Sequence, residues 1–220
     1  MCRFLLAESE RPFNPENLIS KFATMAKSSH AYDGDWQGDG CGVAWLEDGI
    51  WRVRTSVLPF WDNLEQFVDL PATNHVVMHA RSASFPQDKG IVAYNQPYVN
   101  GRYAFVFNGL LKGVNLPFRV EGRIGAQKIW SLLQKFLADN PPRESLEITV
   151  DLLNEHSREI QALNIGLCDE ENIYYYSQYG EHPDYYNLRI QRSKDVNIVC
   201  SEDLECMSFE KVETGKVCVL

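Results

Sequence analysis

The chain has 220 residues, of which 45% are hydrophobic and 23% are charged, and its formal net charge is −9. A chain of this size can bury the core of one globular domain, and we expect a single domain over residues 1–220. The negative charge argues against nucleic acid and against an anionic membrane as partners, because both attract clustered Lys and Arg.

The N-terminal half of the chain carries the signals of strands and of one helix. Residues 2–7 predict a first strand, and residues 15–27 have helical spacing, with Asn14 as the N-cap. Two apolar runs within residues 41–57 flank Asp48-Gly49, a dipeptide typical of β-hairpin turns. Further strands are predicted over residues 74–84 and 102–111, with a loop over residues 85–101 between them.

The second half begins with two helices and returns to strands. Residues 124–139 and 143–160 carry apolar side chains at helical spacing. Short strands are then predicted over residues 162–168, 172–178, 185–191, 196–201 and 216–220. Strands, a central pair of helices and further strands favour an α+β fold of mostly antiparallel sheets covered by helices.

The cysteines predict a reduced, cytoplasmic protein. No apolar run approaches the roughly 20 residues of a membrane span, and the N-terminus becomes charged too early for a signal peptide. No C-x-x-C pair is present, and Ala44 stands where a calcium loop beginning at Asp33 and Asp35 would need a bidentate Glu. We therefore expect free thiols, no metal and no other cofactor; the six cysteines are Cys2, Cys41, Cys168, Cys200, Cys206 and Cys218.

Three features combine into a candidate for amide chemistry: Cys2, the strand end His79 to Arg81, and Asn108-Gly109. Removal of Met1 would give Cys2 a free α-amine with a pKa of about 7.7 to 8.0, beside a thiol with a pKa of about 8.5. Such an amine can take the thiol proton without a separate histidine. An Asn amide and a Gly backbone N–H can stabilise an oxyanion, and Arg can hold a carboxylate with two hydrogen bonds.

These residues, in this order, resemble the class II glutamine amidotransferases of the N-terminal nucleophile hydrolase superfamily. The similarity is greatest to the single-domain branch that includes γ-glutamyl amide hydrolases. The stretches that carry it are MCRFLL, GDGCGVAW, HARSAS, NQPY, FNGLL, DYYNLR and CSEDL, which are distributed over nearly the whole chain. The resemblance implies one glutamine amidotransferase type 2-like domain over residues 1–220, folded as a four-layer αββα sandwich of two antiparallel sheets.

Carried over by position, the resemblance implies a role for each matching residue. Cys2 becomes the nucleophile and its freed amine the general base, and Asn108 with Gly109 becomes the oxyanion hole. Arg81, with Ser82 beside it, becomes the contact for the substrate α-carboxylate. The family's aromatic and histidine positions differ here at Cys41, Gln96 and Phe107, none of which is the nucleophile or the oxyanion hole.

The resemblance breaks at the residue that should bind the α-ammonium of glutamine. The family carries an Asp at the start of the helix that follows Asn-Gly, and alignment on Gly122 places Gly125 there. Glu121 lies nearby, and Arg123 adds a cation at this helix start. We therefore expect Arg123 and Gly125 to alter the choice of acyl donor.

The resemblance favours an N-terminal cysteine amidohydrolase that cleaves a γ-glutamyl-type side-chain amide through a thioester. Two alternatives stay open: a glutaminase subunit that supplies ammonia to a separate synthase, and a catalytically silent binding or regulatory protein. The expected partners are a small-molecule amide and, for the glutaminase alternative, that synthase; neither nucleic acid nor a membrane is expected.

Overall fold

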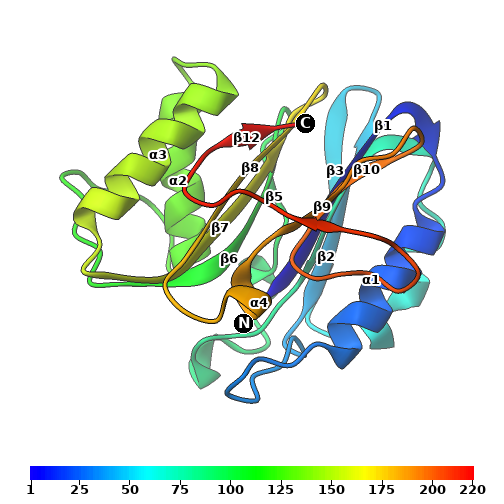
Figure 1. The fold of residues 1–220 in the computed structure, drawn as a ribbon, viewed down its shortest axis with the longest axis horizontal. Coiled ribbons are helices and arrows are strands. Elements are labelled where there is room, and N and C mark those ends of the chain that lie inside the picture. The colour runs from blue at the N-terminus through cyan, green and yellow to red at the C-terminus, as the bar shows by residue number, and fades with distance from the viewer.

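The computed structural model describes residues 1–220, which form two β-sheets packed face to face between helices (Figure 1). One sheet has seven strands in the order β11-β9-β10-β1-β4-β2-β3. Its strands are β1 (Arg3–Phe13), β2 (Cys41–Glu47), β3 (Ile50–Ser56), β4 (Thr73–Ala80), β9 (Arg189–Gln191), β10 (Asn197–Cys200) and β11 (Glu210–Lys211).

The second sheet has five strands in the order β12-β8-β7-β6-β5. Its strands are β5 (Tyr98–Val99), β6 (Ala104–Lys112), β7 (Glu159–Cys168), β8 (Ile173–Tyr179) and β12 (Cys218–Val219). All strand pairs in both sheets are antiparallel. The helices are α1 (Glu16–Ser28), α2 (Gly125–Leu137), α3 (Pro142–His156) and the short α4 (Pro183–Tyr186).

The layer order is α1, seven-stranded sheet, five-stranded sheet, then α2 with α3 (Figure 1). Side chains alternate along each strand, so one face of β1 packs on α1 through Leu5 while the other face packs on the second sheet through Phe4 and Leu6. In β6, Val106 likewise faces the inter-sheet layer, whereas Phe105 faces α2 and α3. The structure thus has the four-layer αββα architecture that the resemblance implies.

Most predicted elements are confirmed, with corrections at their ends. Pro15 is the N-cap of α1, not Asn14; the Asn14 side chain instead accepts a hydrogen bond from the Glu16 N–H at 2.9 Å. The predicted strand over residues 185–191 is wrong before Arg189, because Tyr186 ends α4 and β9 covers only Arg189–Gln191. The helix predicted over residues 143–160 ends at His156, because β7 already begins at Glu159. No helix of the structure is long and apolar enough to cross a membrane.

Candidate active site

The candidate nucleophile lies at the start of β1, against the end of β4. Arg3 is opposite Ala80 in the strand register, so the residues just before β1 lie next to those just after β4. The Cys2 Sγ lies 3.4 Å from the Ser82 backbone nitrogen, which donates to it, and 3.4 Å from the Ser82 carbonyl oxygen. The sheet therefore brings Cys2, Arg81 and Ser82 together, as the resemblance implies.

Burial and nearby positive charge shift the pKa of the Cys2 thiol in opposite directions. Burial raises its pKa, while the N-terminal ammonium, the Ser82 N–H and Arg81 each oppose that rise. The net pKa is still raised. A thiol in this state carries little thiolate at neutral pH and needs a base to become a nucleophile.

Met1 is held by three polar contacts. Its N-terminal ammonium binds the carboxylate of Asp35. Its carbonyl oxygen accepts hydrogen bonds from the Gln37 side-chain amide at 2.9 Å and from the Tyr185 hydroxyl at 3.2 Å. With Met1 in place, the nitrogen of Cys2 is a peptide nitrogen without basic character, so the base that the mechanism needs is absent from this form of the chain.

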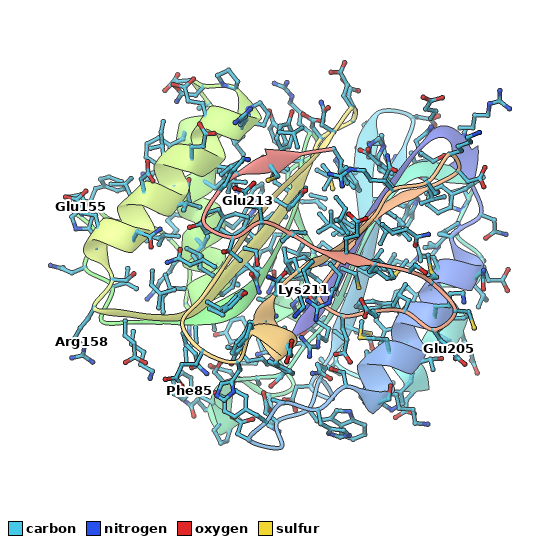
Figure 2. The ribbon with its side chains drawn as sticks, in the orientation of Figure 1. Phe85, Glu155, Arg158, Glu205, Lys211 and Glu213 are labelled. Carbon is cyan, nitrogen blue, oxygen red and sulfur yellow. The ribbon has the colours of Figure 1, made fainter.

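Arg81 is buried directly beside Cys2 and holds the loop that follows it. One guanidinium nitrogen donates to the Asp88 carbonyl at 2.8 Å, and another donates to the Asn95 side-chain oxygen at 3.4 Å. Its guanidinium carbon lies 5.6 Å from the centre of the Tyr94 ring. The same loop presents the exposed Phe85 at the lower edge of the molecule (Figure 2), on the side where the N-terminus lies in Figure 1.

Asn108 lies on the face of β6 that looks into the inter-sheet layer, two residues after Val106. It is 1% exposed, and neither its amide nitrogen nor its amide oxygen has a hydrogen-bond partner in the protein. Buried amides almost always have partners, so an unpartnered one points to a role on a ligand. Next to it, a Cβ on Gly109 would lie 2.0 Å from the Ala162 carbonyl oxygen, and only glycine permits this approach of β7.

A buried polar chain joins the end of β4 to β6 at Phe107, the residue before Asn108. His79, which is opposite Phe4 in the register, has its Nε2 3.2 Å from the Gln96 side-chain nitrogen. Gln96 also donates to the Phe107 carbonyl at 3.1 Å and accepts from the Phe107 N–H at 2.6 Å. Burial, with Arg81 nearby, lowers the pKa of His79 to about 3, so this histidine is neutral at physiological pH and acts as a structural link.

Arg123 and Gly125 lie at the exposed start of α2, and no contact joins them to Cys2. The Arg123 N–H donates to the Gln127 side-chain oxygen at 2.9 Å, and Gln127 in turn donates to the Ala93 carbonyl at 3.1 Å. This end of α2 is therefore tied to the loop that follows Arg81. A Cβ on Gly125 would meet nothing within 4 Å, so no packing constraint demands glycine there.

The sequence reasoning missed several residues of this site. Asp35 and Gln37 contact Met1 from the loop between α1 and β2, and Tyr185 contacts it from α4. Only the Gly/Asp composition around Asp35 gave a local signal. Two surface cavities, of about 410 and 430 Å³, are lined by other residues and include none of the predicted site residues. All six cysteines are unpaired, and no three His, Cys, Asp or Glu side chains are placed to hold a metal ion.

Comparison with solved structures identifies the class of fold. A glutamine aminotransferase class-II domain protein from Silicibacter pomeroyi superposes with a TM-score of 0.64 at 15% identity, over 99% of this chain and 94% of that one. A predicted glutamine amidotransferase from Pseudomonas aeruginosa gives a TM-score of 0.54 at 14% identity, over 99% and 92% of the two chains. Known protein-family profiles and curated proteins give no match to the sequence.

A longer protein carries the same fold in part of its chain. The glutamine phosphoribosylpyrophosphate amidotransferase from B. subtilis superposes with a TM-score of 0.69 at 12% identity, over 100% of this chain but only 47% of that one. The fold is therefore that of the class II glutamine amidotransferase domains, the N-terminal nucleophile hydrolase sandwich. The resemblance predicted from the sequence is confirmed at the level of this fold.

Proposed function

We propose that the chain is an N-terminal cysteine amidohydrolase of the class II glutamine amidotransferase type, which hydrolyses a γ-glutamyl-type side-chain amide. One observation carries the proposal: the Asn108 amide is buried without a partner, directly after Phe107, which Gln96 joins to His79 at the strand end beside Cys2. A preorganised donor without a protein partner is what a tetrahedral oxyanion requires. The fold shared with glutamine amidotransferase domains supports the same assignment.

The reaction begins when Met1 is removed by hydrolysis of its peptide bond. The freed α-amine of Cys2 takes the thiol proton, and the sulfur lone pair attacks the carbonyl carbon of the amide. The carbonyl π electrons move to oxygen, where the Asn108 side-chain N–H and the Gly109 backbone N–H stabilise the negative charge. Arg81 stabilises the substrate by binding its carboxylate, once its guanidinium turns from the Asp88 carbonyl and the Asn95 side-chain oxygen.

Collapse of the tetrahedral intermediate breaks the C–N bond. The ammonium of Cys2 donates its proton to the leaving nitrogen, which departs as ammonia or an amine and leaves an S-acyl thioester on Cys2. The same amine then takes a proton from water, whose oxygen attacks the thioester. The products are the free carboxylic acid and the thiol of Cys2, so the cycle consumes only amide and water.

Position 125, at the start of α2, is a glycine and not an acid. This favours an acyl donor whose recognition does not depend on an acid at that position. The exposed Arg123 guanidinium and the open space at Gly125 can accept a larger or more anionic group there than an Asp would allow. The loss of one charge-assisted hydrogen bond to an ammonium costs about 1.5–3 kcal/mol. Free glutamine should therefore be a poor substrate unless another residue provides that charge.

A Met1-free chain, made by cleaving a fusion directly before Cys2, tests the proposal. We expect it to release ammonia or amine from γ-glutamyl amides, and we expect Cys2→Ala to abolish this release. Cys206→Ala is the matched control, because Cys206 is an exposed thiol with no part in the site. Hydrolysis that survives Cys2→Ala would show that another group carries the reaction.

The contacts of Met1 favour one second function, that of a catalytically silent binding protein. Three polar groups hold Met1 over the nucleophile, and a chain that keeps it has no amine base at Cys2. The intact mass of protein from its native source distinguishes the two. Retention of Met1 in all molecules would favour the silent protein.

Supply of ammonia to a separate synthase stays a prediction, to be tested by co-purification.

A further inference from the structure

An α-ammonium group is already bound beside the candidate nucleophile, and its acceptor is Asp35. The ammonium of Met1 contacts the Asp35 carboxylate, and the Ser82 hydroxyl donates to the same carboxylate oxygen. The backbone of Ser82 in turn contacts the Cys2 Sγ. Asp35 is thus connected to the thiol through a single residue, Ser82. It lies on the side that Met1 vacates when Met1 is cleaved from the chain.

The carboxylate of Asp35 is charged when it makes these contacts. Burial alone would raise its pKa, but the hydrogen bonds from the Met1 ammonium and the Ser82 hydroxyl outweigh burial and lower it. Asp35 and Arg81 both act electrostatically on the Cys2 thiol, with opposite signs. An anion and a cation therefore lie near the same sulfur.

This arrangement is complementary to the head group of an amino acid. A substrate with both an α-carboxylate and an α-ammonium can place the first at Arg81 and the second at Asp35, while its side-chain amide reaches Sγ. The position where the resemblance implies an acid for this ammonium is Gly125, which offers no charge and lies on an exposed helix end. Asp35 is the acid that the structure shows in contact with an α-ammonium.

We infer that Asp35 binds the α-ammonium of the substrate, in the space that Met1 leaves, and so replaces the acid absent at Gly125. The inference rests on the proposed function, because it assigns a specificity residue to that same site. The Gln37 amide and the Tyr185 hydroxyl, which now hold the Met1 carbonyl, line this subsite. The substrate class is then γ-linked amides of amino acids with a free α-amine, in preference to des-amino or N-acylated analogues.

Two substrates with the same leaving group test the inference: γ-L-glutamyl-p-nitroanilide and glutaryl-p-nitroanilide, which lacks only the α-ammonium. In the Met1-free chain, Asp35→Asn should lower the ratio of kcat/KM for the first substrate over the second by about 10- to 100-fold. Asn keeps an oxygen that can accept the Ser82 hydroxyl, so the loop retains this contact. Asp48→Asn is the matched control, because it makes the same change in the hairpin turn at the opposite end of β2.

The outcomes separate the inference from the proposed function. An unchanged ratio, or an equal loss for both substrates, would overturn the inference; equal loss would place Asp35 on the amine of Cys2. If neither substrate is hydrolysed, the proposed function fails, and binding then decides the inference. Calorimetry on the Met1-free Cys2→Ala chain should show that L-glutamine binds more tightly than 4-carbamoylbutanoate, and that Asp35→Asn removes the difference. Equal binding of the two ligands before the substitution would overturn the inference.

Discussion

Two asparagines face each other across β6 and β7, and their unequal hydrogen bonding gives a test of the site that needs no substrate. Asn108 is opposite Asn164 in the register, and both are almost fully buried. The Asn164 amide donates to the Tyr186 carbonyl at 2.7 Å, whereas the Asn108 amide has no protein partner. Replacing each by Ala removes the same volume, so the two variants differ mainly in the hydrogen bonds that each substitution breaks.

Asn164→Ala leaves the Tyr186 carbonyl without this donor, which costs about 1–3 kcal/mol beyond the effect of the cavity. Asn108→Ala breaks no hydrogen bond, so only the cavity remains as a cost. We therefore expect the Asn164 variant to be about 1–3 kcal/mol less stable than the Asn108 variant. For a chain of this length that difference is several degrees in Tm.

The assay is urea and thermal unfolding of both variants in the Met1-bearing chain, followed by kinetics in the Met1-free chain. Asn108→Ala should lower kcat by about 10²- to 10³-fold, the effect of losing one oxyanion donor. Equal destabilisation by the two substitutions would contradict the assignment of Asn108 to the oxyanion hole, because it would mean that its side chain already has hydrogen-bond partners within the protein.

Three further predictions follow from the geometry. Gly109→Ala forces a Cβ against the Ala162 carbonyl, so it should separate β6 from β7 and abolish activity; faster amide exchange in β7 would show this, and native exchange would contradict it. Gly125→Asp should raise the free energy of unfolding by about 1 kcal/mol, since an acid in the first turn of a helix is favourable and the site has room; thermal unfolding measures it, and a lower Tm would contradict it. Because the pKa of Cys2 is raised while Met1 is attached, its alkylation by iodoacetamide should reach half its maximal rate at a higher pH than that of an ordinary thiol; an equal or lower midpoint would contradict this.

The local patterns of the sequence predicted most of the fold. The helical spacing of α2 and the Asp48-Gly49 turn between β2 and β3 each depend on neighbouring residues, and both are where the pattern placed them. The two-residue strands β5 and β11 were not predicted from the sequence. Strands this short show no periodicity, and they form only by hydrogen bonding to a neighbouring strand.

The site was predictable where its residues stand at strand ends and not where it depends on contacts between distant loops. Cys2 and Arg81 flank paired strand ends, so their proximity followed once the fold was expected. The link from His79 through Gln96 to β6 crosses from one sheet to the other, and no sequence spacing encodes it. The contact of Asp35 with the N-terminal ammonium likewise exists only in the folded chain.

The most direct test of the account is whether Cys2 becomes a nucleophile when Met1 is removed. Met1-free and Met1-bearing chains are incubated with 6-diazo-5-oxo-L-norleucine, a glutamine-like alkylating label, and the labelled residue is located by intact mass and peptide mapping. We expect one label, on Cys2, in the Met1-free chain, and little or none in the Met1-bearing chain. An unlabelled Cys2 in a folded Met1-free chain, or equal labelling of the two chains, would contradict it.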